Sequence, residues 1–455
     1  MDRLFKNALD HARADYVEIR VEERTTTRIT YVGQELEDIS DFTSLGGCIR
    51  ALSRGGWGFV SFNDIEDLPR YVRLACQQAA MVGRTESRLA AVPAVADSVA
   101  ASVGVDPRQV PLAHKEELCR RYNQQILSHA RIQTSSVRYR DTFVRTAFAT
   151  SEGADLQQEA LFCGISLVAI AKDGANIQNG VKGVGDLRGF QIVEHREADC
   201  EEVAERAVAL LAAQPVKGGR YAVIVDPLLG GVFAHEAFGH LSEADVVYEN
   251  PRLLAKMQLG SPIGGKDLSI VDDPTLPNEA GSYRYDSEGT PGRRTYLIEN
   301  GVLTCRLHSR ETAAKMGEPV TGNARALSHE FPPIVRMSNT YIEPRQWAFG
   351  DLVADTGEGI YARGSLGGQT DCEMFTFSAE EAFLIRDGRL GERVREVVLT
   401  GNVFETLAYI DAIGNDLALY GGLEGCGKAD QCPLRVSTGS PHFRIRECLI
   451  GGRSS

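Results

Sequence analysis

The chain has 455 residues, 43% of them hydrophobic, and a formal net charge of −13. This length exceeds what a single hydrophobic core organises, so two domains are expected. The acidic balance argues against nucleic acid or an anionic membrane surface as the main partner. No apolar run reaches the roughly 18 residues of a membrane-spanning helix. The start, Met1 to Lys6, lacks the features of a signal peptide, so we expect a cytoplasmic protein.

The first part of the chain has the pattern of a mixed α/β domain. We expect helices over 2–12, about 65–82, 114–128 and 198–213, and strands over 16–21, 28–32, 47–52, 57–62, 137–150 and 161–172. The early strands are separated by short Gly and Asp turns, which predicts an antiparallel meander that the two later strands extend. In the second helix Leu68, Val72, Leu74 and Cys76 are expected to point inward, after a cap by Asn63 and Asp64. Residues 92–111 are interpreted as a surface connection.

Gln214 to Gly219 stop the last of these helices and are interpreted as a linker, so the predicted domains are 1–214 and 215–455. The second domain opens with a buried strand at 221–226 and a helix around His235. It then turns β-rich, with strands at 268–272 and 443–446, a helix at 404–413, and hairpins at 296–303 and 382–390 that carry Asn-Gly and Asp-Gly turns. The predicted fold class is α+β: an N-terminal mixed α/β domain with an antiparallel sheet, and a β-rich C-terminal domain carrying a metal-binding helix.

The ten cysteines are scattered through the chain, which is typical of reduced and mostly buried thiols.

The segment from Phe233 to Leu241 places two histidines and a glutamate within six residues, at His235, Glu236 and His240. Two neutral imidazoles can hold a divalent metal, and the neighbouring glutamate would lie close enough to take a proton from a water molecule at that metal. The pattern resembles the helical His-Glu-x-x-His motif with one additional residue. The alternative is that these histidines are packed, hydrogen-bonded core residues.

The additional residue changes the geometry, because on an ideal α-helix side chains five apart point about 140° away from each other. A regular helix would therefore separate His235 from His240. Either a π-bulge inside the helix or an early helix end at Gly239 would bring His240 back toward His235.

A catalytic zinc site normally has three protein ligands, so a third must come from elsewhere in the chain. Cys426 is the candidate, because its flanking glycines would let the backbone approach a metal and Lys428 would favour a thiolate. The alternative is a buried structural cysteine in a glycine-rich turn. Cys432 follows in the same loop as an alternative ligand.

These segments resemble the TldD/PmbA family of peptidases, in particular its metal-containing, TldD-like members. The resemblance covers most of the second domain and, more weakly, 46–50 and 151–153 in the first. The motifs that carry the resemblance occur in the order expected for the family, at 235–240, 271–277, 286–291, 297–301, 336–341, 367–371 and 426–428.

The resemblance implies Zn²⁺ bound by His235, His240 and Cys426, with Glu236 as the catalytic glutamate. It further implies a metalloprotease for unfolded or flexible polypeptides, including peptide-antibiotic precursors and unfolded antitoxins. The expected assembly is a heterodimer with a PmbA/TldE-like subunit that lacks the metal motif, or a homodimer. Glu243 and Asp245 could orient a ligand imidazole, although solvated loop carboxylates are the alternative.

Two other functions stay open at this point. The chain could be a non-catalytic binding or scaffold subunit that holds unfolded peptide around a closed, four-ligand metal site. It could also hydrolyse a non-peptide amide. If it is a peptidase, the glycines at 359, 364, 367 and 368 suggest that substrate adds as a β-strand along Gly359 to Asp371, although tight turns would use glycine equally well.

Overall fold

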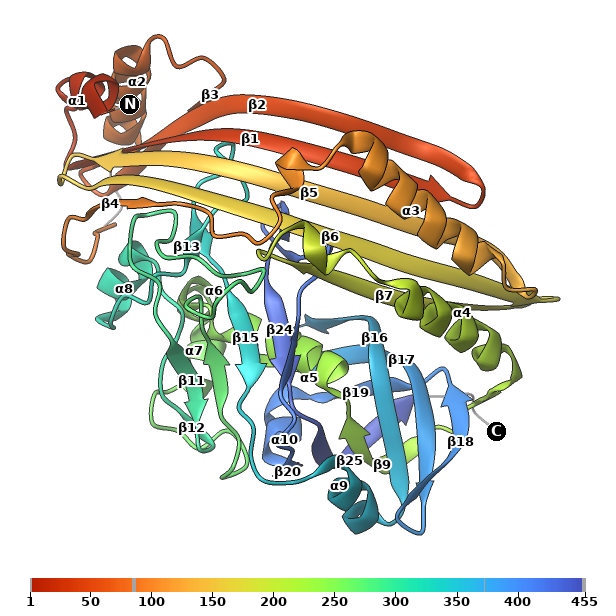
Figure 1. Cartoon of the computed structure of the whole chain (residues 1–455). Coiled ribbons are helices and arrows are strands. Elements are labelled where there is room, and N and C mark those ends of the chain that lie inside the picture. The colour runs from red at the N-terminus through yellow and green to blue at the C-terminus, as the bar shows by residue number, and fades with distance from the viewer. Residues whose placement is uncertain (1, 84–86, 372, 452–455) are drawn as a thin grey trace.

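A sheet of unusually long strands crosses the upper part of the molecule in Figure 1, a computed structural model that describes residues 2–83, 87–371 and 373–451. The strand order is β3-β2-β1-β5-β6-β4, and β7 also pairs with β6. The predicted antiparallel meander is confirmed, since β1, β2 and β3 pair in sequence, and β5 and β6 extend it as expected. The strands are β1 (Tyr16–Val32), β2 (Glu35–Ser53), β3 (Gly56–Phe62), β4 (Ala96–Val99), β5 (Ile132–Thr150), β6 (Asp155–Asp173) and β7 (Asn176–Asp186).

The two short strands expected at 16–21 and 28–32 are one strand, β1. The polar stretch between them stays extended because it pairs with β2 on one side and with β5 on the other. Residues 92–111 are more than a surface excursion, because β4 lies within them and pairs in parallel with β6.

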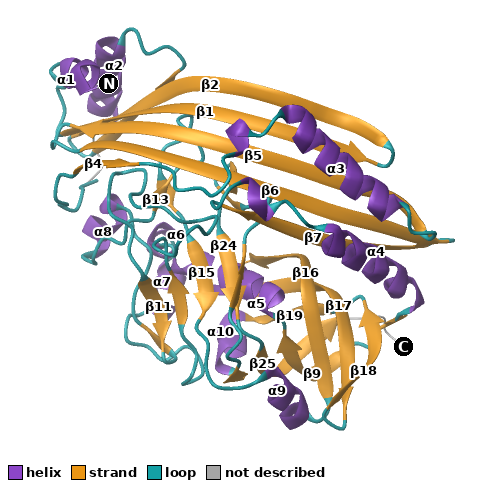
Figure 2. Cartoon of the chain, viewed as in Figure 1, coloured by secondary structure: helices purple, strands orange, loops and turns teal. Residues whose placement is uncertain are grey.

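The two faces of this sheet have different chemistry. Odd-numbered residues of β1, such as Val17, Ile19 and Ile29, join the hydrophobic clusters under the helices. Most even-numbered residues between Glu18 and Arg28 are charged, and Arg20 and Arg24 donate hydrogen bonds to carbonyl groups of the C-terminal half. Helices therefore pack on the apolar face of the sheet, and the charged face is turned toward the second half of the chain (Figure 2).

Four helices cover the apolar face: α1 (Asp2–Leu9), α2 (Leu68–Val82), α3 (Leu112–Leu127) and α4 (Glu197–Ala212). In α2 the predicted inward set is right for Leu68, Val72 and Cys76, but Leu74 is 40% exposed. The predicted cap is also wrong, because the Asp67 side chain accepts the hydrogen bond from the backbone N–H of Arg70.

The C-terminal half contains a closed ring of strands in the order β16-β9-β25-β19-β17, since β17 pairs back to β16. This ring is extended by β18 and β8, while β20 pairs with β25. Its strands are β8 (Gln214–Pro215), β9 (Gly219–Val225), β16 (Gly359–Asp371), β17 (Met374–Arg386), β18 (Arg389–Arg395), β19 (Val398–Asn402), β20 (Ile410–Ile413) and β25 (Phe443–Gly451).

A second C-terminal sheet has the order β12-β11-β10-β15-β24-β21. Its strands are β10 (Ile270–Asp272), β11 (Thr295–Glu299), β12 (Val302–Leu303), β15 (Asn339–Ile342), β21 (Ala418–Tyr420) and β24 (Ser437–Ser440). Two small hairpins accompany it: β13 (Ala324–Arg325) with β14 (Ile334–Val335), and β22 (Cys426–Lys428) with β23 (Gln431–Leu434).

The helices of this half are short. They are α5 (Pro227–Phe233), α6 (Ala244–Glu249), α7 (Pro251–Lys256), α8 (Arg310–Met316), α9 (Phe349–Thr356) and α10 (Val403–Ala408). Both predicted hairpins are confirmed, as β11–β12 and β17–β18. The helix expected over 404–413 ends at Ala408, because Ile410–Ile413 pairs with β25 instead. The expected linker after α4 begins with β8, which pairs with β18.

The helices of the described residues include none that is both long and apolar enough to cross a membrane. The nine cysteines among those residues form no disulfide and seven are buried, as predicted, while Cys372 lies outside the described residues.

Candidate metal centre

The centre is built at the end of α5, which starts with a well-defined N-terminus. The Asp226 side chain accepts a hydrogen bond of 2.9 Å from the N–H of Leu229, and Pro227 occupies the first turn. Gly231 allows the helix to lie directly on β24, because a Cβ at this position would lie 2.5 Å from the backbone nitrogen of Gly439. The close contact with β24 fixes the direction in which the next residues leave the helix.

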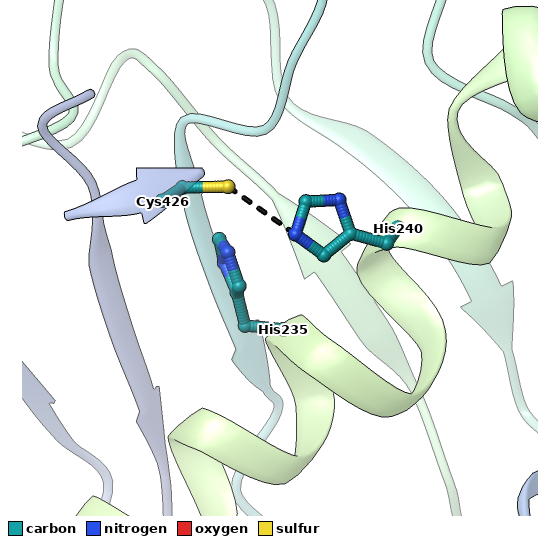
Figure 3. Close-up of side chains that lie close together, drawn as sticks. All are labelled: His235, His240 and Cys426. Atoms are coloured by element: carbon teal, nitrogen blue, oxygen red, sulfur yellow. Dashed lines mark hydrogen bonds between the residues drawn. The ribbon is translucent and has the colours of Figure 1, made fainter. Parts of the chain in front are cut away.

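Residues Ala234–Gly239 continue α5 as a π-helix, the first of the two alternatives that the sequence suggested. The N–H of His240 donates to the carbonyl of His235, a hydrogen bond that spans five residues. The additional residue between the histidines is thereby absorbed, and both imidazoles project from one side of the helix (Figure 3). Their ring centroids lie 5.2 Å apart.

Cys426 lies opposite the two histidines, on the short strand β22 (Figure 3). Its Sγ is 3.3 Å from Nε2 of His240. One potential ligand atom from each of His235, His240 and Cys426 lies within 4.8 Å of the others. The structure therefore brings all three sequence-predicted ligands together.

The chemistry of this group suits zinc. Both ring nitrogens of His235 are buried and have no hydrogen-bond partner within the described part of the chain. Buried polar atoms without partners are rare and costly, and a metal ion would satisfy one of these nitrogens. Two imidazoles and one thiol are a zinc donor set, and three protein ligands leave a position open.

The charges around the cysteine favour its thiolate. Burial raises the pKa of Cys426, but the imidazoles of His235 and His240 outweigh burial and lower this pKa to about 4. A thiolate is the form of cysteine that binds metals. Lys428 does not act on the sulfur as predicted, because its Nζ instead contacts Glu243, Asp245 and the carbonyl of Val335.

Glu243 and Asp245 have different roles. Oε2 of Glu243 lies 3.0 Å from Nδ1 of His240, so the carboxylate orients this imidazole and leaves Nε2 facing the cysteine. Although Glu243 is completely buried, which raises its pKa, the charges of His240 and Lys428 lower this pKa to about 2. Asp245 pairs with Lys428 at 2.7 Å rather than with a histidine.

Glu236 lies beside the three candidate ligands without joining them. Its Oε1 lies 4.0 Å from Nε2 of His235, and its Oε2 lies 3.9 Å from Nε2 of His240. The side chain is 28% exposed, whereas that of His235 is 4% exposed. Because the His240 side chain is 23% exposed as well, both it and the Glu236 carboxylate are open to solvent, and the carboxylate can exchange protons with a molecule bound beside them.

Arg336 was not assigned a role from the sequence, yet it holds the strand that carries the cysteine. Its fully buried guanidinium donates to the carbonyl of Cys426 at 2.7 Å and to that of Gln431 at 3.2 Å. Cys432, by contrast, is exposed and does not belong to the ligand group. An isolated arginine in a sequence gives no signal of such a role.

The segment expected to receive a substrate strand is β16, and half of it is already occupied. Ile360–Ala362 pairs with β9 on one side and with β17 on the other, so this half cannot accept another strand. From Ser365 to Asp371 the pairing that the structure describes is with β17 alone. The prediction is therefore wrong for the first half and stays a prediction for the second.

An imidazole, imidazole and thiolate group with an adjacent glutamate has the chemistry of a metal-dependent hydrolase. Comparison with known proteins supports this class. The chain matches the family models for the PmbA/TldA metallopeptidase domain 1 at 17–79, central domain at 105–214 and C-terminal domain at 218–452. The chain belongs to the TldD/PmbA family of metallopeptidases.

Relatives match over almost the whole chain. A metalloprotease of Synechocystis is 44% identical over 97% of this chain and 96% of its own length. A metalloprotease of Methanocaldococcus jannaschii is 36% identical over 92% and 93%. A protein of Saccharolobus solfataricus named as a zinc metalloprotease TldD homologue is 28% identical over 96% and 97%.

Solved structures share the fold. A candidate modulator of a DNA gyrase from Thermotoga maritima has a TM-score of 0.79 at 19% identity over 99% of both chains. TldE from Thermococcus kodakarensis has a TM-score of 0.75 at 18% identity, over 99% of this chain and 100% of its own. The mixed α/β fold with a β-rich C-terminal half is thus confirmed.

Proposed function

We propose that this chain is a zinc-dependent peptidase that cleaves unfolded or flexible polypeptides. In this proposal His235, His240 and Cys426 hold the metal and Glu236 transfers protons. The observation that carries the proposal is the convergence of the three ligand atoms within 4.8 Å, with the Glu236 carboxylate about 4 Å from both imidazoles.

When bound, zinc would supply Lewis acidity that polarises the scissile carbonyl group and a nearby water molecule. Glu236 would take a proton from that water at a carboxylate oxygen and return it to the nitrogen of the leaving amine. Glu243 would keep the proton of His240 on Nδ1, so that Nε2 is free to bind metal. Because a thiolate neutralises more of the metal's charge than a third imidazole would, we expect slow turnover.

The preference for unfolded chains is supported by the edge of β16 beyond Arg363. That edge is paired on one side within the described residues, and β16 contacts the π-helix that carries the histidines. An extended polypeptide could add there through main-chain hydrogen bonds, which tolerate many sequences. A folded protein offers few such free stretches.

We also propose that the chain works as a dimer, with a related PmbA/TldE-like subunit or with a second copy. The support is the first half of β2, which pairs with β1 but, within the described residues, has no strand on its other side. It exposes Leu36, Ile39, Phe42 and Leu45, each 41–43% accessible. A long exposed strand edge with apolar side chains is a surface that proteins normally cover.

The proposed function is tested with one polypeptide in its native and denatured forms, incubated with the zinc-loaded chain in the presence and absence of a related subunit. We expect cleavage of the denatured form, loss of cleavage with a chelator, and recovery with zinc. Peptide binding without cleavage under every condition would instead support the scaffold function.

A further inference from the structure

A second feature of the molecule lies between the charged face of the long sheet and the C-terminal half. It is a cavity of about 780 Å³, bounded by β1, β5 and β6 on one side and by the 274–292, 325–327 and 433–435 segments on the other. This volume lies within the range of ligand pockets, which often form where two parts of a chain meet.

The cavity wall is rich in arginine, although the chain as a whole carries a net charge of −13. The basic residues that line it are Arg20, Arg24, Arg284, Arg325 and Arg435, and the acidic residues are Glu22, Glu159 and Asp286.

Each acidic residue of the wall already has partners. Glu22 lies 3.5 Å from Arg20 and 3.6 Å from Arg24, and Glu159 lies 3.0 Å from Arg145, which is outside the wall. Asp286 accepts hydrogen bonds of 2.9 Å from three backbone N–H groups. These carboxylates are therefore not available to neutralise the remaining arginines.

Arg284 is also paired, since it lies 3.2 Å from Asp97, so Arg325 and Arg435 are the remaining cations, and they are neighbours. Arg325 donates to the carbonyl of Arg435 at 2.8 Å and to that of Met337, and it forms no ion pair with any described residue. The Arg435 guanidinium lies over the Phe162 ring at 4.6 Å and makes neither a hydrogen bond nor an ion pair within the described residues. Arginine stays charged in proteins, so two partly buried cations here lack an anion.

Other cations surround Arg435. Burial lowers the pKa of its guanidinium, and the positive charges of Arg24, Arg140 and Arg325 lower it further. A bound anion would relieve this repulsion, and a carboxylate would fit because the planar guanidinium binds carboxylates through two parallel hydrogen bonds.

The cavity and the candidate metal centre share structural elements. Leu434 lines the cavity, and its backbone pairs with that of Cys426 across the β22–β23 hairpin. Arg325 donates to the carbonyl of Met337, whose side chain packs against the π-helix at Gly239. The candidate metal ligands do not line the cavity but Leu434 does, so a group bound there would lie beside the hairpin that carries the thiol.

We propose that Arg325 and Arg435 bind a carboxylate of the polypeptide substrate. This chain would then prefer substrates that have an acidic residue or a free C-terminus at a fixed position relative to the cleaved bond. The identity of the ligand as a polypeptide rests on the proposed peptidase function. The apolar part of the wall, which includes Val144, Phe148 and Leu161, would accommodate the neighbouring side chains of an extended chain.

The test measures binding of three fluorescent decapeptides to the full zinc-loaded chain carrying Glu236→Gln, so that cleavage does not interfere. One peptide is neutral and amidated, the second has a single glutamate and is amidated, and the third is neutral with a free C-terminal carboxylate. We expect at least one carboxylate peptide to bind about tenfold more tightly than the neutral one. The peptide that gains identifies the source of the carboxylate, and equal binding of all three would overturn the inference.

Substitutions then place the preference in the cavity. Arg435→Gln and Arg325→Gln should each abolish it, whereas Arg138→Gln should preserve it, because Arg138 is an exposed arginine of β5 that lies outside the wall and pairs with Glu424, which is also outside it. A preference that survives both cavity substitutions contradicts the inference. Should a variant fail to fold, a photoreactive group beside the peptide glutamate can be used on the chain with intact arginines, and cross-links away from 325–327 and 433–435 would count against it.

The two proposals can fail separately. Cleavage that is equally fast for neutral and carboxylate peptides would contradict the carboxylate site but agree with the proposed peptidase function. Carboxylate-dependent binding, without cleavage of any peptide by the zinc-loaded parent chain, would support the carboxylate site but contradict the proposed peptidase function.

Discussion

Nδ1 of His240 lies 3.0 Å from Oε2 of Glu243, and this contact leaves Nε2 of His240 facing Cys426. The same carboxylate lies 2.9 Å from Nζ of Lys428, two residues beyond the cysteine. One buried glutamate thus ties the helix that carries the histidines to the strand that carries the thiol.

Glu243→Gln should lower zinc affinity by about 10–100-fold, because the imidazole loses the charged partner that fixes its tautomer and orientation. The measurement is a competition titration against a zinc-binding dye. The matched control is Asp245→Asn, which also alters a partner of Lys428 but does not touch His240. An equal loss in both variants would assign the effect to Lys428 rather than to the imidazole.

Glu236→Gln should retain zinc but lose peptide hydrolysis by at least about 100-fold, because the glutamate is placed to move protons and not to bind metal. Metal analysis and a peptidase assay on the same preparation check this. Activity close to that of the parent would refute the role given to Glu236.

Replacing His235, His240 or Cys426 by alanine should each lower zinc occupancy after dialysis, since each removes one of three ligands. Cys432→Ala is the control, because it removes an exposed thiol of the same hairpin and should leave occupancy unchanged. Loss of metal in the control variant alone would transfer the third ligand to Cys432.

Gly231→Ala should destabilise the protein by about 1–3 kcal/mol, because the added Cβ would lie 2.5 Å from backbone of β24 and would force α5 away from it. Zinc affinity should fall as well, since the π-helix that continues α5 carries His235 and leads into His240. Gly350→Ala in α9 is the control, because a Cβ there would have no described atom within 4 Å other than its chain neighbours and the nearby backbone of its own helix. Thermal unfolding and zinc titration of both variants provide the comparison, and equal behaviour would contradict the packing argument.

Much of the site could be predicted from sequence because its residues lie in short, chemically distinct motifs. The five-residue spacing of the histidines excluded a regular helix, and the π-helix is one of the two solutions that geometry permits. The roles of Lys428 and Arg336 could not be read in the same way. Both depend on which carbonyl and carboxylate groups the fold brings near them from distant segments.

The fold shows a similar division. Hairpins with Asn-Gly and Asp-Gly turns were predictable because the turn is local, whereas the polar middle of β1 is a strand only because neighbours pair with it on both sides. The division at residues 214 and 215 stays a prediction. The arginine-lined cavity was not foreseeable, since its arginines, at 20, 24, 284, 325 and 435, come from distant segments that only the assembled chain brings together.

X-ray absorption at the zinc edge of the purified, zinc-loaded chain identifies the atoms that bind the metal. We expect one sulfur at about 2.3 Å and two imidazole nitrogens at about 2.0–2.1 Å, with a remaining light-atom ligand from solvent. A first shell with two sulfurs, or with no sulfur, would contradict the assignment of His235, His240 and Cys426 as the metal ligands.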